Sequence, residues 1–113
     1  MAAKGTPTAI RIGGRTWDIQ YLSAERMAGN LGLCRGDDGV LEIRAGQTPF
    51  GLRDTVLHEI LHAIVYHQGR SGSAPVDEET HARCTATGLM AVLQDNPLFA
   101  KWLISSASIE IST

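Results

Sequence analysis

Apolar and polar positions alternate over residues 8–12 and 15–22, and Gly13-Gly14 between them is a two-residue hairpin signal. Two further apolar-rich stretches, 31–34 and 40–44, are separated by the turn-rich residues 35–39. A period of two is typical of strands that bury one face. The pattern therefore predicts a small antiparallel sheet of three or four strands, formed from residues 8–12, 15–22, 31–34 and 40–44.

Beyond residue 45 the apolar spacing becomes helical. Thr48 is suited to the N-cap, Pro49 to the first helical position, and Gly69 to a stop after Gln68. Apolar side chains cover much of the circumference, so we expect this to be the central buried helix. These side chains are Leu52, Val56, Leu57, Ile60, Leu61, Ile64 and Val65.

Two more helices are predicted downstream. Residues 70–76 have the composition of a loop, and Asp77 is suited to cap a helix over 78–94. An Asp-Asn-Pro break then restarts a short helix over 97–104. The second helix follows closely enough on the first to pack against it.

The predicted fold class is α+β, with a small sheet packed on a central helix. A short helical turn capped by Ser23 is expected over 24–28. Residues 1–7 are predicted to be a flexible tail, and the pattern does not decide between strand and disorder for 105–113. A length of 113 residues suits one domain over 1–113.

Composition and charge narrow the class of protein. The net charge is −2 and the basic residues are scattered, which argues against a nucleic-acid-binding domain. No secretory signal and no membrane-spanning run is visible, so we expect a soluble, cytoplasmic protein. Cys34 and Cys84 are predicted to be free thiols, because two distant cysteines do not make a disulfide framework.

The central helix carries the pattern His58-Glu59-Ile60-Leu61-His62. Each helical residue turns 100°, so His62 lies about 40° from His58 and one turn further along. Two imidazoles at that spacing can bind one zinc ion. Glu59 is turned about 60° from His62, where it can reach a metal-bound water without ligating the metal.

The simpler alternative is a helix with two ordinary histidines. The motif lies among apolar neighbours, which predicts that the helix is buried on several sides. Buried imidazoles without partners are costly, and a metal ion would satisfy them. The zinc site is therefore the preferred interpretation.

Zinc in a catalytic site needs a third protein ligand and an open position for water. A longer three-histidine motif would require Gly at position 65 and His at 68, where the chain has Val65 and Gln68. Glu78 and Glu79, at the start of the second predicted helix, both point roughly toward its apolar side. Either is a candidate third ligand, and both also suit the positive end of a helix.

Three other side chains are candidates for supporting roles. Asp54 lies one turn before His58 and could hold its second ring nitrogen. Tyr66 lies one turn after His62 and could donate to an oxyanion. His81 lies near the edge of the inward side and is a candidate for the second shell or for substrate contact.

The segment Thr55–Ile64, with a hairpin before it and a Glu-bearing helix after it, resembles the minimal zincin metallopeptidases. ImmA/IrrE-type proteins, SprT-like proteins and small phage-encoded metallopeptidases are the similar groups, and the resemblance covers roughly residues 30–100. It implies a gluzincin site with two His and one Glu on zinc. It also implies peptide-bond hydrolysis by a zinc-activated water, with Glu59 as general base. The Glu-Ala-Asn pattern of the ImmA/IrrE helix is absent.

The expected function is therefore that of a zinc metalloendopeptidase acting on a protein or peptide. Two alternatives are a zincin-fold regulatory or virion-associated binding protein with little proteolysis, and a hydrolase of another amide. Residues 40–44 are predicted to be an edge strand that aligns an extended substrate. Because the chain is short, a homodimer or another partner is expected to complete the cleft.

Overall fold

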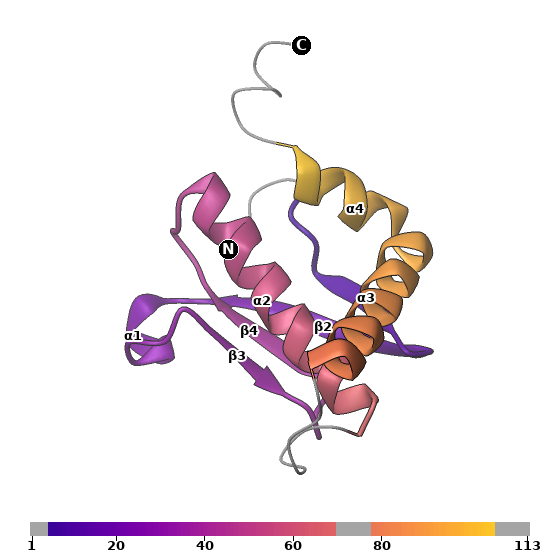
Figure 1. The fold of residues 1–113 in the computed structure, drawn as a ribbon. Helices are drawn as coiled ribbons and strands as arrows, with labels where there is room; N and C mark the ends of the chain where they lie inside the picture. Colours follow the sequence, from indigo (N-terminus) through magenta and orange to yellow (C-terminus); the bar gives the residue numbers. More distant parts are fainter. Residues whose placement is uncertain (1–4, 70–77, 106–113) are drawn as a thin grey trace.

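Four strands form one mixed sheet in the order β1-β2-β4-β3 (Figure 1). The strands are β1 (Ala9–Ile12), β2 (Arg15–Leu22), β3 (Gly32–Arg35) and β4 (Val40–Arg44). A computed structural model describes residues 5–69 and 78–105 of the chain. The predicted α+β fold class is confirmed, and each predicted strand is present.

One strand pair differs from the expected antiparallel sheet. β2 and β4 are parallel, from Asp18 opposite Val40 to Leu22 opposite Arg44. Between them the chain passes through the short helix α1 (Ala24–Met27) and then β3, which runs antiparallel to β4. β4 therefore fills the space between β2 and β3.

The predicted edge strand is consequently wrong. β4 has a hydrogen-bonded neighbour on each side, while β1 and β3 form the two edges. The physical reason is burial, because Leu41 and Ile43 of β4 are 0% exposed and suit a central position. β3, whose residues are only partly buried or exposed, occupies the edge instead.

Helix α2 (Pro49–His67) begins and ends as its sequence predicts. The Thr48 hydroxyl accepts a hydrogen bond from the Gly51 N–H at 3.1 Å, and Pro49 occupies the first turn. Gly69 follows with a φ of +71°, which ends the helix at little cost because glycine has no Cβ. The side toward the sheet is buried and includes Thr55, Val56, Glu59, Ile60, Ala63 and Ile64.

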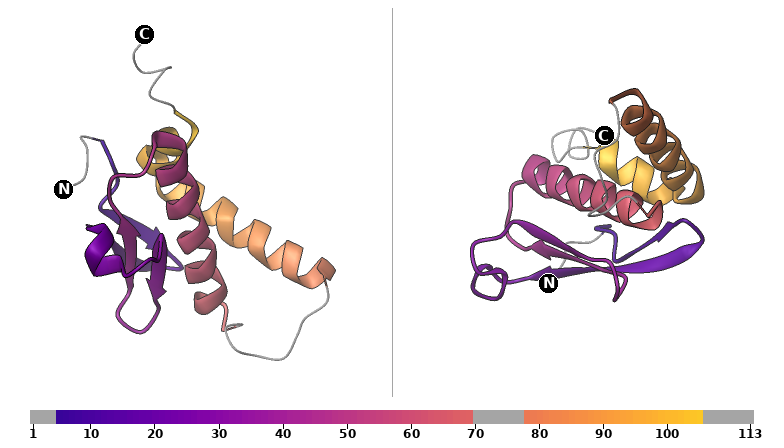
Figure 2. Two further views of the ribbon diagram at one scale, coloured as in Figure 1. Left: turned by 90° about the vertical axis from the view of Figure 1, so that its left-hand side faces the viewer. Right: turned by 60° about the horizontal axis from the view of Figure 1, so that its bottom comes forward.

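Helices α3 (Glu78–Asp95) and α4 (Pro97–Ile104) lie on the same side of the sheet as α2 (Figure 2). A Cβ on Gly88 of α3 would lie 2.4 Å from Ile64 of α2, so the two helices approach closely there. Nearer the end of α2, the Gln68 side chain donates to the Cys84 carbonyl at 2.8 Å. These contacts make α3 antiparallel to α2.

One apolar core joins the sheet to the three longer helices. β1, β2, β4 and the three longer helices contribute side chains that lie almost entirely out of contact with solvent, such as Trp17, Ile60 and Val92, while β3 contributes the partly buried Cys34. None of the helices in the described ranges is both long and apolar enough to cross a membrane. Residues 1–4 of the predicted tail 1–7, the predicted loop 70–76, and residues 106–113 of the undecided segment 105–113 lie outside the described residues.

Candidate metal centre

The two motif histidines point their Nε2 atoms at each other across one turn of α2. The Nε2 atoms of His58 and His62 are 3.1 Å apart, and the ring centroids are 4.8 Å apart. Two nitrogens bound tetrahedrally to one zinc ion lie roughly 3.3 Å apart, since each Zn–N distance is about 2.0–2.1 Å. The pair therefore fits two ligand positions on a single zinc ion.

Both histidines are exposed, which corrects one step of the sequence argument. The apolar residues of α2 face the sheet and α3, and the histidines occupy the side that neither covers. A buried imidazole in need of a partner is therefore not the reason to expect a metal here. The geometry of the two Nε2 atoms is the better reason.

Glu59 lies between the motif helix and the sheet and is only 5% exposed. Burial raises the pKa of its carboxyl group, while the nearby His62 and His58 imidazoles lower it. The carboxyl group lies over Gly32 of β3, where an added Cβ would be 2.8 Å from Glu59 Oε2. The missing side chain at Gly32 thus makes room for the candidate general base.

Gly32 and Cys34 were not singled out from the sequence as parts of the site. Cys34 is a partly buried residue of β3 that packs against the core. Burial raises the pKa of the Cys34 thiol to about 11, and the negative charge of Glu59 adds to the shift. The only sequence signal for these two residues was the short Gly-Leu-Cys strand, which carries no motif.

The Tyr66 hydroxyl donates a hydrogen bond to Asp37 Oδ1 at 2.5 Å. Asp37 belongs to the turn between β3 and β4, and this bond, first among several causes, raises the pKa of Tyr66. The ring also meets Trp17 edge to face at a centroid distance of 6.1 Å. In this structure the predicted oxyanion donor therefore holds the end of β3 against α2.

Glu79, His81 and Asp54 are not brought to the histidine pair. Glu79 is exposed and lies 3.5 Å from Arg83 Nη2, and Glu78 has no described side chain. His81 is also exposed, on the same first turns of α3. Asp54 is exposed and makes no hydrogen bond to His58; it lines a separate depression between the start of α2 and the end of α4.

The position of Glu79 follows from how α3 packs. Cys84 lies beside Gln68, so the residues before Cys84 continue past the end of α2 and away from His62. The left view of Figure 2 shows the first turn of α3 apart from α2. Within the described ranges no group of three His, Cys, Asp or Glu side chains could hold a metal ion. Among the described residues, His58 and His62 are placed as two zinc ligands and Glu59 as the base beside them. The third ligand stays a prediction.

Comparisons of the chain with protein-family models, curated proteins and solved structures found no match.

Proposed function

We propose that this protein is a zinc-dependent metallopeptidase of the zincin type. The observation that carries the proposal is the pair of Nε2 atoms of His58 and His62, 3.1 Å apart, with Glu59 buried beside them. Zinc, when bound, supplies a Lewis acid that polarises a peptide carbonyl and activates water. His58 and His62 would hold the ion.

Glu59 is the proposed general base. It accepts a proton from the attacking water and passes that proton to the nitrogen of the departing amine. Its burial against β3 holds the carboxyl group in one place on the helix, and Gly32 leaves the space it needs. A base that is held in position loses little freedom at the moment of reaction.

The edge strand β3 is suited to align an extended substrate beside Glu59. The Leu31 carbonyl accepts from the Arg44 N–H at 2.8 Å, so Leu31 and Leu33 direct their backbone groups toward β4. Gly32 and Cys34 then direct their N–H and C=O groups to the open side. A peptide that pairs with these groups would run past the histidine pair.

The third ligand is proposed to be Glu78 or Glu79, the two acidic residues at the start of α3. In the described arrangement Glu79 pairs with Arg83, so its use would require that pair to open and the first turn to move. An exposed pair of this kind contributes about 0.5 kcal/mol or less. A partner or a second copy of the chain that covers the histidines is the proposed means of completing the cleft.

The test measures zinc content and cleavage of a generic unfolded protein. Wild type should bind one zinc ion and cleave, and Glu59→Gln should keep the zinc while cleavage falls at least about a hundredfold. His58→Asn and His62→Asn should lose the zinc. His67→Asn is the matched control, because His67 lies on the other side of α2, packed over Gly13.

A zincin-fold binding protein without proteolysis is the second candidate. It is favoured by the pairing of Glu79 with Arg83, 3.5 Å apart, which engages one of the two proposed third ligands elsewhere. If wild type and Glu59→Gln both bind zinc and neither cleaves, this second function replaces the first. If wild type binds no zinc, both are wrong.

A further inference from the structure

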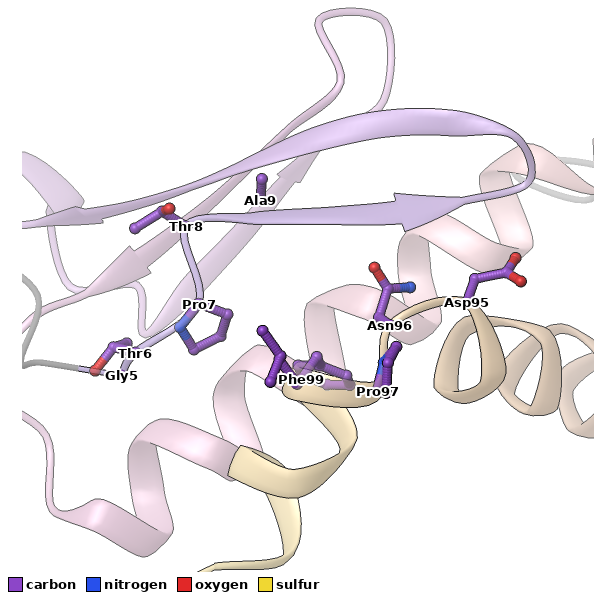
Figure 3. A pocket seen from close by; sticks show the side chains of 10 residues that line it. Gly5, Thr6, Pro7, Thr8, Ala9, Asp95, Asn96, Pro97 and Phe99 are labelled. Atoms are coloured by element: carbon purple, nitrogen blue, oxygen red, sulfur yellow. The ribbon is translucent and has the colours of Figure 1, made fainter.

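A groove lies on the opposite edge of the sheet from β3, between the start of β1 and the junction of α3 with α4 (Figure 3). It has a volume of about 510 Å³. One wall is the segment 5–9, and the other is the segment 95–99. Neither wall belongs to the candidate metal centre.

The Asn96 side chain shows which chemistry this sheet edge accepts. Its Oδ1 accepts from the Arg11 N–H at 2.9 Å, and its Nδ2 donates to the Arg11 carbonyl at 2.9 Å. This is the pairing that a residue of an added antiparallel strand would make with an edge strand through its own N–H and C=O. A second bond from Nδ2 to the Val92 carbonyl, at 2.7 Å, fixes the amide in place.

Ala9 lies two residues before Arg11 on β1 and presents its backbone N–H and C=O on the same edge of the sheet. The Thr8 carbonyl accepts from the Ile19 N–H at 2.9 Å, so Thr8 and Ile10 face β2. Backbone direction alternates along a strand, and Ala9 therefore directs its N–H and C=O outward as Arg11 does. Asn96 occupies the backbone groups of Arg11, while Ala9 is one of the residues that line the groove (Figure 3).

The charge and the apolar surface of the groove indicate which side chains a bound segment would carry. Asp95 lines it and is the last residue of α3, a helix with no basic residue in its last turn. Because a helix C-terminus carries partial negative charge, an Asp there adds to a potential that favours a cation. Leu98 is 82% exposed at the same groove and offers an apolar contact.

We propose that this groove binds a short extended peptide segment of a partner protein, carrying one basic and one apolar side chain. The peptide backbone pairs with Ala9, the basic side chain meets Asp95, and the apolar side chain packs on Leu98. Asn96 limits the pairing to this short stretch, because it already fills the next position on the edge. This surface is separate from the β3 edge proposed for the substrate.

The test is an NMR titration of the full chain with the capped peptide Ac-Thr-Leu-Lys-Val-NH2. The amides of Ala9, Leu98 and Phe99 should shift together, with a Kd on the order of 1 mM, as suits so small an interface. The same peptide with Glu in place of Lys should bind more weakly. Shifts confined to Gly32 and Cys34, or equal binding of the two peptides, would overturn the proposal.

Variants separate binding from folding. Asp95→Asn should weaken binding of the Lys peptide about two- to fivefold and yet raise the Tm, because it removes a negative charge from a helix C-terminus. Asp38→Asn, the same change on an exposed residue of the turn between β3 and β4, at the other edge of the sheet, should leave binding unchanged. Equal affinities for wild type and Asp95→Asn would contradict the proposal.

Ala9→Pro removes the outward N–H and should weaken binding by roughly fivefold, whereas Ala9→Ser should keep it. If Ala9→Pro does not fold, Leu98→Ser takes its place, with a loss of binding expected. The same amides shifting on dilution without peptide would assign the groove to a second copy of the chain. Shifts on removal of residues 1–4 would assign it to the chain's own N-terminal segment. Either result would overturn the proposal.

Discussion

Two residues of β3, Gly32 and Cys34, lie close to the candidate base Glu59. Glu59 is buried against β3, where the missing side chain at Gly32 leaves room for its carboxyl group. Cys34, two residues further along the strand, shares the same space and feels the charge of Glu59. We therefore expect substitutions at Gly32 and Cys34, two positions outside the motif, to change the stability of the protein or its activity.

Gly32→Ala should disturb both stability and the site. The added Cβ would lie 2.8 Å from Glu59 Oε2 and 2.9 Å from Thr55 Cγ2, too close without movement. We expect the free energy of unfolding to fall by about 1–3 kcal/mol, and cleavage by the folded protein to fall as well. Urea unfolding and an activity assay on the folded fraction measure the two effects.

Gly88→Ala is the matched control for that experiment. An added Cβ on Gly88 of α3 would lie 2.4 Å from Ile64 of α2, so this position is also crowded. The side chains around Gly88 are those of Ile64 and Gln68, and Glu59 is not among them. Overpacking there should change stability without changing the activity of the folded fraction. Equal activity losses in the two variants would show that Gly32 has no special relation to Glu59.

The Cys34 thiol should make stability depend on pH in the alkaline range. Its pKa is raised from an ordinary 9.0 to about 11. Between these pH values the unfolded chain releases the proton while the folded chain keeps it, so the folded state binds more protons and stability falls as pH rises. Wild type should lose stability between pH 9 and 11 more steeply than Cys34→Ala in urea unfolding with a reductant present. Cys84→Ala should retain the wild-type slope, and identical slopes for all three proteins would contradict the assignment.

At the scale of elements, the caps and turns account for where the helices begin and end. Ser23, Thr48 and the glycine after α2 each perform the role that their sequence position predicts. α1 is the exception at its C-terminal end, because its cap residue Ala28 has a φ of +51°. A non-glycine residue in this left-handed region is strained.

Ala28→Gly should therefore stabilise the protein by about 0.5–1 kcal/mol, as relief of strain exceeds the added freedom of the unfolded chain. Thermal unfolding measures the change. The reverse substitution next to it, Gly29→Ala, should destabilise, since Gly29 has a φ of +90°. A lower Tm for Ala28→Gly would show that the local strain is smaller than the entropy difference.

At the scale of the whole molecule, a zinc ion held by His58, His62 and a Glu of α3 would link α2 to the first turn of α3. In the described structure these two helices lie apart at that end (Figure 2). Zinc at a hundredfold excess over its Kd should raise the free energy of unfolding by about 2.7 kcal/mol. If a Glu of α3 is the third ligand, amide hydrogen exchange in its first turn should slow when zinc is added. Glu78→Gln or Glu79→Gln should abolish that slowing, according to which residue is the ligand. Exchange unchanged by zinc in wild type would place the third ligand elsewhere.

The sequence by itself determined the local features. The i, i+4 spacing of His58 and His62 brings two nitrogens together on any helix, and the cap residues marked where that helix begins and ends. Alternation identified β1 and β2, and the turn-rich residues 35–39 separated β3 from β4. These features depend on contacts within a few residues, which is why a pattern could predict them.

Only the tertiary structure decided what depends on distant segments. Strand order placed β4 inside the sheet and β3 at its edge, and packing left the two histidines on the open side of α2. A helical wheel gives the direction of Glu79 around α3, but its distance from His62 along the axis is set by the contact of Cys84 with Gln68. The space at Gly32 exists only because β3 passes beneath Glu59, and no local pattern encodes that approach.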